Sequence, residues 1–141
     1  MKQSRLPDLF ERDGANHELV LRVLQVANAP MTAYEILHAL RRNGFNAPLT
    51  VYRALKRLID SGQVHRLESI NAYLSCSGHK HDHGPVVFAI CRECGHVDEL
   101  AGNALAKRLR ADAKQHGFHV EGAIIELKGT CATCAKDRTA E

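Results

Sequence analysis

The sequence has no secretory signal and no long hydrophobic run, and these two absences limit where the protein can act. The longest uninterrupted aliphatic or aromatic run, VVFAI at residues 86–90, is far too short to cross a bilayer, which needs about 20 apolar residues. Low-complexity segments and internal repeats are also absent. We therefore expect a cytoplasmic protein with no membrane partner.

The motifs of common zinc enzymes are missing as well. No His-Glu-x-x-His motif occurs, and no His-x-Glu motif is paired with Pro-Cys-x-x-Cys. A zinc hydrolase or deaminase is the main enzyme alternative, because His, Cys and Glu near zinc can activate water. An electron-transfer iron protein with thiolate ligands is a second alternative. We expect neither an enzyme nor a small-molecule substrate.

The second part of the chain has no excess of positive charge, and the net positive charge lies in the first part. Residues 1–83 hold 11 Lys and Arg against 8 Asp and Glu, whereas residues 84–141 hold 8 of each, for a formal net charge of +3. Within residues 41–66, Asp60 is opposed by six basic residues: Arg41, Arg42, Arg53, Lys56, Arg57 and Arg66. This local excess predicts a phosphate-binding surface.

Two helices are predicted before residue 45. Residues 1–15 predict a weak helix at most. Asn16 can cap the helix that follows, whose apolar residues have the spacing of one buried face: Val20, Val23, Leu24 and Ala27. A capping box from Thr32 to Glu35 starts the second helix, because each side chain can accept a hydrogen bond from the other residue's backbone N–H. We expect this helix to end at Gly44.

A third helix and a hairpin follow. Pro48 suits the first turn of a helix, where its missing N–H is no loss, and Gly62 ends that helix. Its core face consists of Val51, Leu55, Leu58 and Ile59. VHRL and AYLSC, separated by a polar stretch that contains Asn71, predict a two-stranded hairpin. Three helices followed by a hairpin are the element order of a winged helix-turn-helix, a DNA-binding module.

The expected fold class is α+β. A winged-helix DNA-binding domain occupies residues 1–77, a His-rich hinge residues 78–85, and a small α/β dimerisation domain residues 86–141. The last domain has about 50 residues, too few for a self-sufficient core. A structural metal and a partner subunit are therefore both expected.

Strands and one helix alternate in this last domain. VVFAIC and HVDEL predict two strands around the turn CRECG. Residues 102–117 predict a helix with Leu105, Leu109 and Ala113 on one face, and residues 118–127 predict a third strand. The tail after Cys134 is polar, so we expect it to fray.

Four of the five cysteines form two Cys-x-x-Cys pairs, Cys91 with Cys94 and Cys131 with Cys134. In a reducing compartment such pairs favour metal thiolates over disulfides. Each pair places two thiolates on a tight turn, and two such turns form a closed four-cysteine zinc site with Zn–S bonds of about 2.3 Å. The alternative is two unrelated pairs of buried or redox-active thiols. With no open coordination position, this zinc would stabilise the domain and catalyse nothing.

The fifth cysteine indicates a second metal site. Cys76 ends the hairpin, His65 lies on the preceding strand, Glu99 follows the first cysteine pair, and the linker holds His79, His81 and His83. One thiolate, two imidazoles and one carboxylate favour zinc. The alternative is a buried structural cysteine with solvated linker histidines. The spacing leaves open which linker histidine is a ligand.

Several segments together resemble the ferric uptake regulator family: PLTVYRALKRLIDSGQVHR, a His-rich linker, CRECGHVDEL and a distal CATC. The resemblance covers about residues 16–134. Within the family, TAYEIL, VHRLES and the cysteine just after AYLS are most similar to the zinc uptake regulator branch. The resemblance implies a homodimeric, zinc-responsive repressor of zinc-uptake genes that binds a palindromic operator. A family sensor of iron, manganese, nickel or peroxide is the alternative.

The resemblance also implies how the regulatory zinc is held. In the zinc-sensing branch the ligands are the His of the wing, the Cys that ends it, a linker His and the Glu after the first cysteine pair. These positions correspond here to His65, Cys76, His83 and Glu99, with His81 as the substitute for His83. Two zinc ions per chain are therefore expected. Iron-sensing members have a His-His-Asp-His cluster next to the first cysteine pair, whereas PVVFAI intervenes here.

The third predicted helix is expected to enter the major groove of DNA. Tyr52 can contact thymine methyl groups, and Arg53 can donate paired hydrogen bonds to guanine. Phosphate contacts fix the register without specifying sequence, and we assign them to Lys56, Arg57 and Arg66. The alternative is a solvated basic helix face. The full set of expected DNA-binding residues is Thr50, Tyr52, Arg53, Lys56, Arg57 and Arg66.

Overall fold

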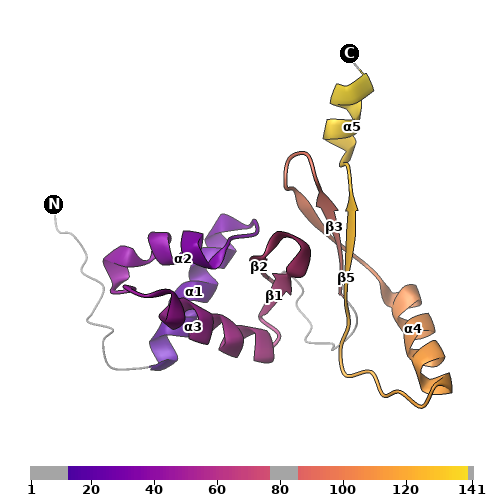
Figure 1. Ribbon diagram of the computed structural model, residues 1–141, viewed down its shortest axis with the longest axis horizontal. Coiled ribbons are helices and arrows are strands. Elements are labelled where there is room, and N and C mark those ends of the chain that lie inside the picture. The colour runs from indigo at the N-terminus through magenta and orange to yellow at the C-terminus, as the bar shows by residue number, and fades with distance from the viewer. Residues whose placement is uncertain (1–12, 77–85, 140–141) are drawn as a thin grey trace. The chain divides into compact units, whose positions relative to one another are not determined.

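The computed structural model describes residues 13–76 and 86–139, and the chain separates into two compact units, Met1–His79 and Lys80–Glu141. Each unit is described by itself (Figure 1). The weak helix expected near the N-terminus falls largely outside the described residues, as do the candidate ligands His81 and His83. Among the helices that are described, none is both long and apolar enough to pass through a bilayer.

The first unit consists of three α-helices followed by a two-stranded hairpin. In chain order its elements are α1 (Asp13–Ala27), α2 (Ala33–Ala39), the 3-10 helix η1 (Arg41–Asn43), α3 (Pro48–Asp60), β1 (Val64–Leu67), the 3-10 helix η2 (Glu68–Ile70) and β2 (Ala72–Ser75). This order confirms the predicted winged helix-turn-helix. The three helices enclose one apolar core, in which Leu24, Phe45, Leu55 and Leu58 are fully buried.

The first helix starts earlier than expected. It begins at Asp13, so Asn16 lies inside its first turn and the predicted cap is wrong. Gly14 costs only about 1 kcal/mol inside a helix, and boundaries are the least reliable part of an assignment from sequence. The helix ends at Ala27, and Asn28 after it adopts a left-handed φ of 46°.

The capping box of α2 forms as predicted. Thr32 Oγ1 accepts a hydrogen bond from the Glu35 N–H over 3.2 Å, and Glu35 Oε2 accepts one from the Thr32 N–H over 2.7 Å. The α-helical part ends at Ala39, and the last turn before Gly44 is the 3-10 helix η1. In α3, Pro48 occupies the first turn, and Gly62, with a φ of 76°, follows the helix.

Backbone hydrogen bonds attach the hairpin to the helices. β1 and β2 pair antiparallel, with Val64 opposite Ser75 and Leu67 opposite Ala72. Met31, in the loop between α1 and α2, exchanges two backbone hydrogen bonds with Tyr73 of β2, at 2.9 and 2.8 Å. The hairpin is therefore held against the helical body as a wing, and side chains on it have a fixed position relative to α3.

The second unit is a three-stranded sheet with one connecting helix and one terminal helix. Its elements are β3 (Val86–Cys91), β4 (Val97–Leu100), α4 (Asn103–Gln115), β5 (Ile124–Gly129) and α5 (Ala132–Thr139). The strand order is β4-β3-β5, with β3 antiparallel to β4 and parallel to β5. Few of its described side chains are buried, namely Val87, Phe88, Ile90, Cys91 and Ala106.

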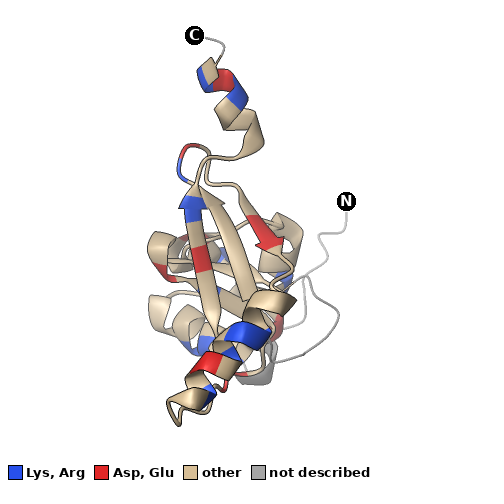
Figure 2. Ribbon diagram, turned by 90° about the vertical axis from the view of Figure 1, so that its right-hand side faces the viewer, with Lys and Arg blue, Asp and Glu red and all other residues tan. Residues whose placement is uncertain are grey.

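Two predictions for this unit are wrong. The last strand begins at Ile124 rather than at residue 118, because ladder pairing with β3 starts only where Val86 lies opposite Ile124. The polar tail after Cys134 forms α5 instead of fraying, and Arg138 of this helix pairs with Glu93. On the predicted face of α4, Leu105 and Leu109 are exposed in the single chain, Ala113 is partly buried, and the buried residue of the helix is Ala106. The helix carries charges of both signs (Figure 2).

Replacing Thr32 with alanine should lower the free energy of unfolding by about 1 kcal/mol, because the Glu35 N–H loses its capping acceptor. Urea denaturation followed by circular dichroism measures this change. Glu35→Gln keeps an oxygen that can accept from the Thr32 N–H and is the matched control, with a smaller expected loss. A Thr32→Ala protein as stable as the parent would show that the capping box does not stabilise α2.

Candidate functional site

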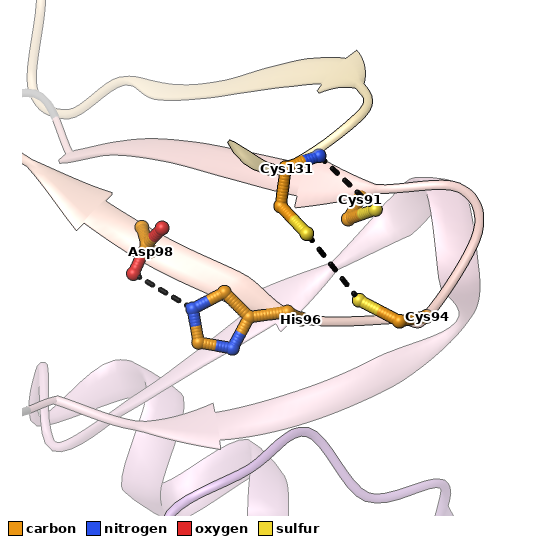
Figure 3. Close-up of polar contacts among 5 residues, drawn as sticks. All are labelled: Cys91, Cys94, His96, Asp98 and Cys131. Carbon is orange, nitrogen blue, oxygen red and sulfur yellow. Dashed lines mark hydrogen bonds and ion pairs between the residues drawn. The ribbon is translucent and has the colours of Figure 1, made fainter. Parts of the chain in front are cut away.

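Four cysteine side chains meet where β3 ends and α5 begins. Cys91 is the last residue of β3, Cys94 lies in the turn that follows, Cys131 precedes α5, and Cys134 lies in its first turn. The parallel pairing of β3 with β5 causes this meeting, because it places Cys91 opposite Gly129, just before Cys131. The four sulfur atoms all lie within 4.8 Å of one another, and Figure 3 shows three of these side chains on their adjoining segments.

The spacing of the sulfur atoms fits a tetrahedral zinc ion. The Sγ atoms of Cys94 and Cys131 are 3.8 Å apart, whereas a disulfide requires about 2.05 Å. A tetrahedron with Zn–S bonds of about 2.3 Å has edges of about 3.8 Å. The cysteines are free thiols. The predicted set of Cys91, Cys94, Cys131 and Cys134 therefore has the donors and the spacing of a closed zinc site, with no coordination position left for a substrate.

Backbone N–H groups favour a thiolate on Cys91. The Cys131 N–H donates a hydrogen bond to Cys91 Sγ over 3.3 Å (Figure 3). This bond, and next the one from the Cys94 N–H, lowers the pKa of Cys91 from 9.0 to about 6. Hydrogen bonding to the Cys131 thiol, and next to the Cys94 thiol, raises the pKa of Cys134 to about 12. A bound zinc ion would hold all four cysteines as thiolates, because a coordinating thiol is deprotonated.

The turn that carries the first cysteine pair has its own supporting contacts. Gly95 has a φ of 76°, which residues with a Cβ rarely adopt, and its N–H donates to the Cys91 carbonyl over 3.0 Å. His96 Nε2 lies 3.0 Å from Asp98 Oδ1 (Figure 3). Glu93 pairs with Arg138, which joins the turn to α5. Nothing in the sequence pattern indicates the last contact, because its partners are far apart along the chain.

Two of the predicted regulatory ligands lie on one face of the wing. His65 on β1 is directly opposite Leu74 on β2, so their side chains share a face. Cys76 comes two residues after Leu74, and its N–H donates to the Gln63 carbonyl over 2.9 Å, which extends the ladder. Side chains alternate along a strand, so Cys76 lies on the same face as His65. Both residues are partly buried, and Glu99 is an exposed residue of β4 in the other unit.

The predicted DNA-binding residues lie on the exposed side of α3 and on the wing. Tyr52, Arg53, Lys56, Arg57 and Arg66 are exposed, and Thr50 is partly buried. Lys56 forms an exposed ion pair with Asp60 at 3.0 Å. Arg66 donates a hydrogen bond to Asn71 Oδ1 over 3.2 Å and lies 3.6 Å from Glu68. Neither Arg53 nor Arg57 forms an ion pair with another residue in the described ranges.

The fold and the cysteine cluster together define a winged-helix protein with a small α/β unit built around a four-thiol metal site. The chain belongs to the ferric uptake regulator family, because the model of that family matches residues 14–128. It is 36% identical over 121 residues to the zinc uptake regulation protein of Escherichia coli K12, which covers 83% of this chain and 69% of that protein.

Two solved structures are similar to most of this chain. One is a zinc uptake regulator complexed with zinc and DNA, with a TM-score of 0.82 and 31% identity over 91% of this chain and 86% of that chain. The other is the holo form of XcZur, with a TM-score of 0.77 and 39% identity over 86% of this chain and 84% of that chain. Both similarities include the winged-helix unit and the cysteine-bearing unit.

Zinc binding to the four-cysteine cluster should strengthen as pH rises. Cys91 supplies a thiolate above about pH 6, but Cys134, with a pKa of about 12, must release a proton to the solvent when zinc binds. The apparent affinity should therefore rise at least about ten-fold per pH unit from pH 6 to 8. Competition against a chromophoric zinc chelator, corrected for its own protonation, measures this. Cys134→Ala should remove one zinc per chain, whereas Cys76→Ala should leave this zinc in place; a pH-independent affinity would exclude thiolate ligation.

Proposed function

We propose that this protein is a zinc-responsive transcriptional repressor. It binds a palindromic operator as a homodimer when zinc is plentiful and represses zinc-uptake genes. The observation that carries this proposal is the similarity, over both units, to a zinc uptake regulator solved with zinc and DNA. The alternative of an iron sensor has no comparable support, because PVVFAI stands before Cys91 where iron-sensing members have a His-His-Asp-His cluster.

DNA recognition is assigned to α3 and the wing. The exposed side of α3 presents Tyr52 and Arg53 for base contacts in the major groove. Lys56 and Arg57 of α3 and Arg66 of the wing neutralise phosphates. The pair between Lys56 and Asp60 does not prevent this, because an exposed i,i+4 ion pair contributes only about 0.3–0.5 kcal/mol. The hydrogen bond from Arg66 to Asn71 limits the positions available to its guanidinium, which favours one register on the duplex.

The second unit is assigned to dimerisation. β5 is an edge strand, and an exposed edge can pair with a strand of another chain. Apolar side chains that are 40–66% exposed lie on β5 itself and elsewhere in this unit: Leu100, Leu105, Leu109, Phe118, Ile124 and Leu127. This number of exposed large apolar side chains in one small unit supports an interface with another chain. A symmetric pair of these units would present two α3 helices to the two halves of a palindrome.

A second zinc ion is assigned to regulation. Its proposed ligands are His65, Cys76, His83 and Glu99, with His81 as the substitute for His83. The placement of His65 and Cys76 on one face of the wing supports this set. A thiolate combined with imidazole and carboxylate favours zinc over manganese or iron.

Regulation follows from where these ligands belong. His65 and Cys76 are in the first unit and Glu99 is in the second, so zinc binds best to the arrangement in which they converge. A ligand shifts a conformational equilibrium by its difference in affinity for the two states. A change from mostly inactive to mostly active requires about 5.5 kcal/mol, which is within the binding free energy of a four-ligand zinc site.

Cys76→Ser should abolish zinc-dependent operator binding and leave a folded dimer, because the hydroxyl is a much weaker zinc ligand than the thiolate. Fluorescence anisotropy of operator DNA across a range of free zinc, together with sedimentation analysis, measures both properties. Ser75→Ala, on the opposite face of β2, is the matched control and should respond to zinc as the parent does. Unchanged zinc dependence in Cys76→Ser would remove Cys76 from the sensing site.

Tyr52→Ala should reduce operator binding by about ten-fold and nonspecific DNA binding far less, because disrupting recognition at one base pair costs about 1–3 kcal/mol. Binding to operator and to scrambled duplex, measured at the same salt concentration, gives the ratio of the two affinities. Tyr34→Ala removes another exposed tyrosine, on α2, and should leave the ratio unchanged. An equal loss on both duplexes would show that Tyr52 contacts only the DNA backbone.

A further inference from the structure

The exposed side of α3 carries an apolar residue that the charge pattern does not explain. Leu49, the second residue of the helix, is 57% exposed, and Tyr52, one turn later, is 42% exposed. Leu49, Tyr52, Arg53 and Lys56 stand at i, i+3, i+4 and i+7, so they form a single stripe along the helix. The opposite side is occupied by the core residues Val51, Ala54, Leu55 and Leu58.

Leu49 has no route into the protein core. At about 100° per residue it lies almost diametrically opposite Leu58, which is fully buried. The core already contains Phe45 just before the helix and Val51 just after Leu49. One exposed leucine is ordinary on a protein surface. This one stands in the first turn of the helix assigned to DNA, which is the part of a recognition helix that contacts base edges.

We propose that Leu49 is a specificity-determining residue that contacts the C5-methyl group of thymine in the operator. This inference rests on the proposed function. Leucine has no atom that can donate or accept a hydrogen bond, so it gains nothing from phosphates or from the polar edges of guanine, cytosine or adenine. Thymine alone presents an apolar group in the major groove.

The position of Tyr52 strengthens the assignment. Side chains at i and i+3 are neighbours on a helix surface, so Leu49 and Tyr52 are adjacent apolar positions on the side of α3 that also carries Arg53. Two neighbouring thymines flanked by a guanine would fit these three side chains. Tyr52 and Arg53 alone would specify only one of the two thymines and the guanine. Leu49 therefore adds selectivity at a thymine distinct from the one assigned to Tyr52.

The experiment removes one methyl group from each half-site of the operator. The zinc-loaded full chain first selects its operator from a random duplex library. Each thymine of one half-site, with its symmetry mate, is then replaced by deoxyuridine, which lacks only the C5-methyl. Dissociation constants are measured by anisotropy for the parent, Leu49→Ala and Tyr52→Ala, with Val26→Ala as the control because Val26 is an exposed apolar residue on α1.

At one thymine position, replacement by uracil should weaken binding of the parent by about four-fold per half-site. This is the loss expected for one buried methyl contact. Leu49→Ala should bind the thymine and uracil forms equally at that position, and Tyr52→Ala and Val26→Ala should keep the penalty there. Alanine is a strong helix former, and a thermal melt of Leu49→Ala checks that it folds.

The outcomes separate this inference from the function on which it rests. If selection with zinc enriches no sequence, both fail. Suppose instead that an operator is found. If Leu49→Ala loses affinity at every uracil substitution that weakens the parent, Leu49 does not contact a thymine methyl and the proposed repressor function stands. The same holds if every uracil substitution that weakens the parent has no effect on Tyr52→Ala.

Discussion

The convergence of four cysteine sulfur atoms is the constraint on which the second unit depends. Apart from Cys91, few of its described side chains are buried, and the core of β3 rests on Val87, Phe88 and Ile90. A unit of this size buries too little apolar surface to offset the entropy lost on folding. A zinc ion held by thiolates from both ends of the unit would supply the missing free energy, since structural zinc stabilises small domains by roughly 10 kcal/mol or more. The exposed edge of β5 would then gain its stability from a second copy.

The first unit has the opposite character. Its helices enclose a continuous apolar core from Val20 to Tyr73, and the backbone bonds between Met31 and Tyr73 fix the wing. We therefore expect this unit to fold without a metal, as the proposed function requires of a DNA-binding unit. In that proposal, zinc at the cysteine cluster would stabilise the second unit and a second zinc ion would control DNA binding.

Much of this arrangement follows from sequence alone, where the physical cause is local. The capping box at Thr32, the first-turn Pro48 and the two Cys-x-x-Cys pairs each act within a few residues, and the structure contains all of them. The start of β5, the helix after Cys131 and the contact between Glu93 and Arg138 depend on segments distant in the chain, so no local pattern predicts them. Asn16 failed as a cap because the helix already begins at Asp13. The proposal for Leu49 needed the structure, because the sequence does not show that this side chain is 57% exposed in the first turn of α3.

Hydrogen exchange of the protein with and without metal tests the dependence of the second unit on zinc most directly. The protein is unfolded, stripped of zinc with a chelator, and refolded in the presence of the chelator. The backbone amides of β3 and β5 should then exchange quickly and the protein should be a monomer, while the amides of α1, α2 and α3 stay protected. Readdition of about one zinc per chain should restore both the slow exchange and the dimer. Full protection of β3 and β5 in protein that contains no metal would contradict the claim that the four thiolates hold this unit together.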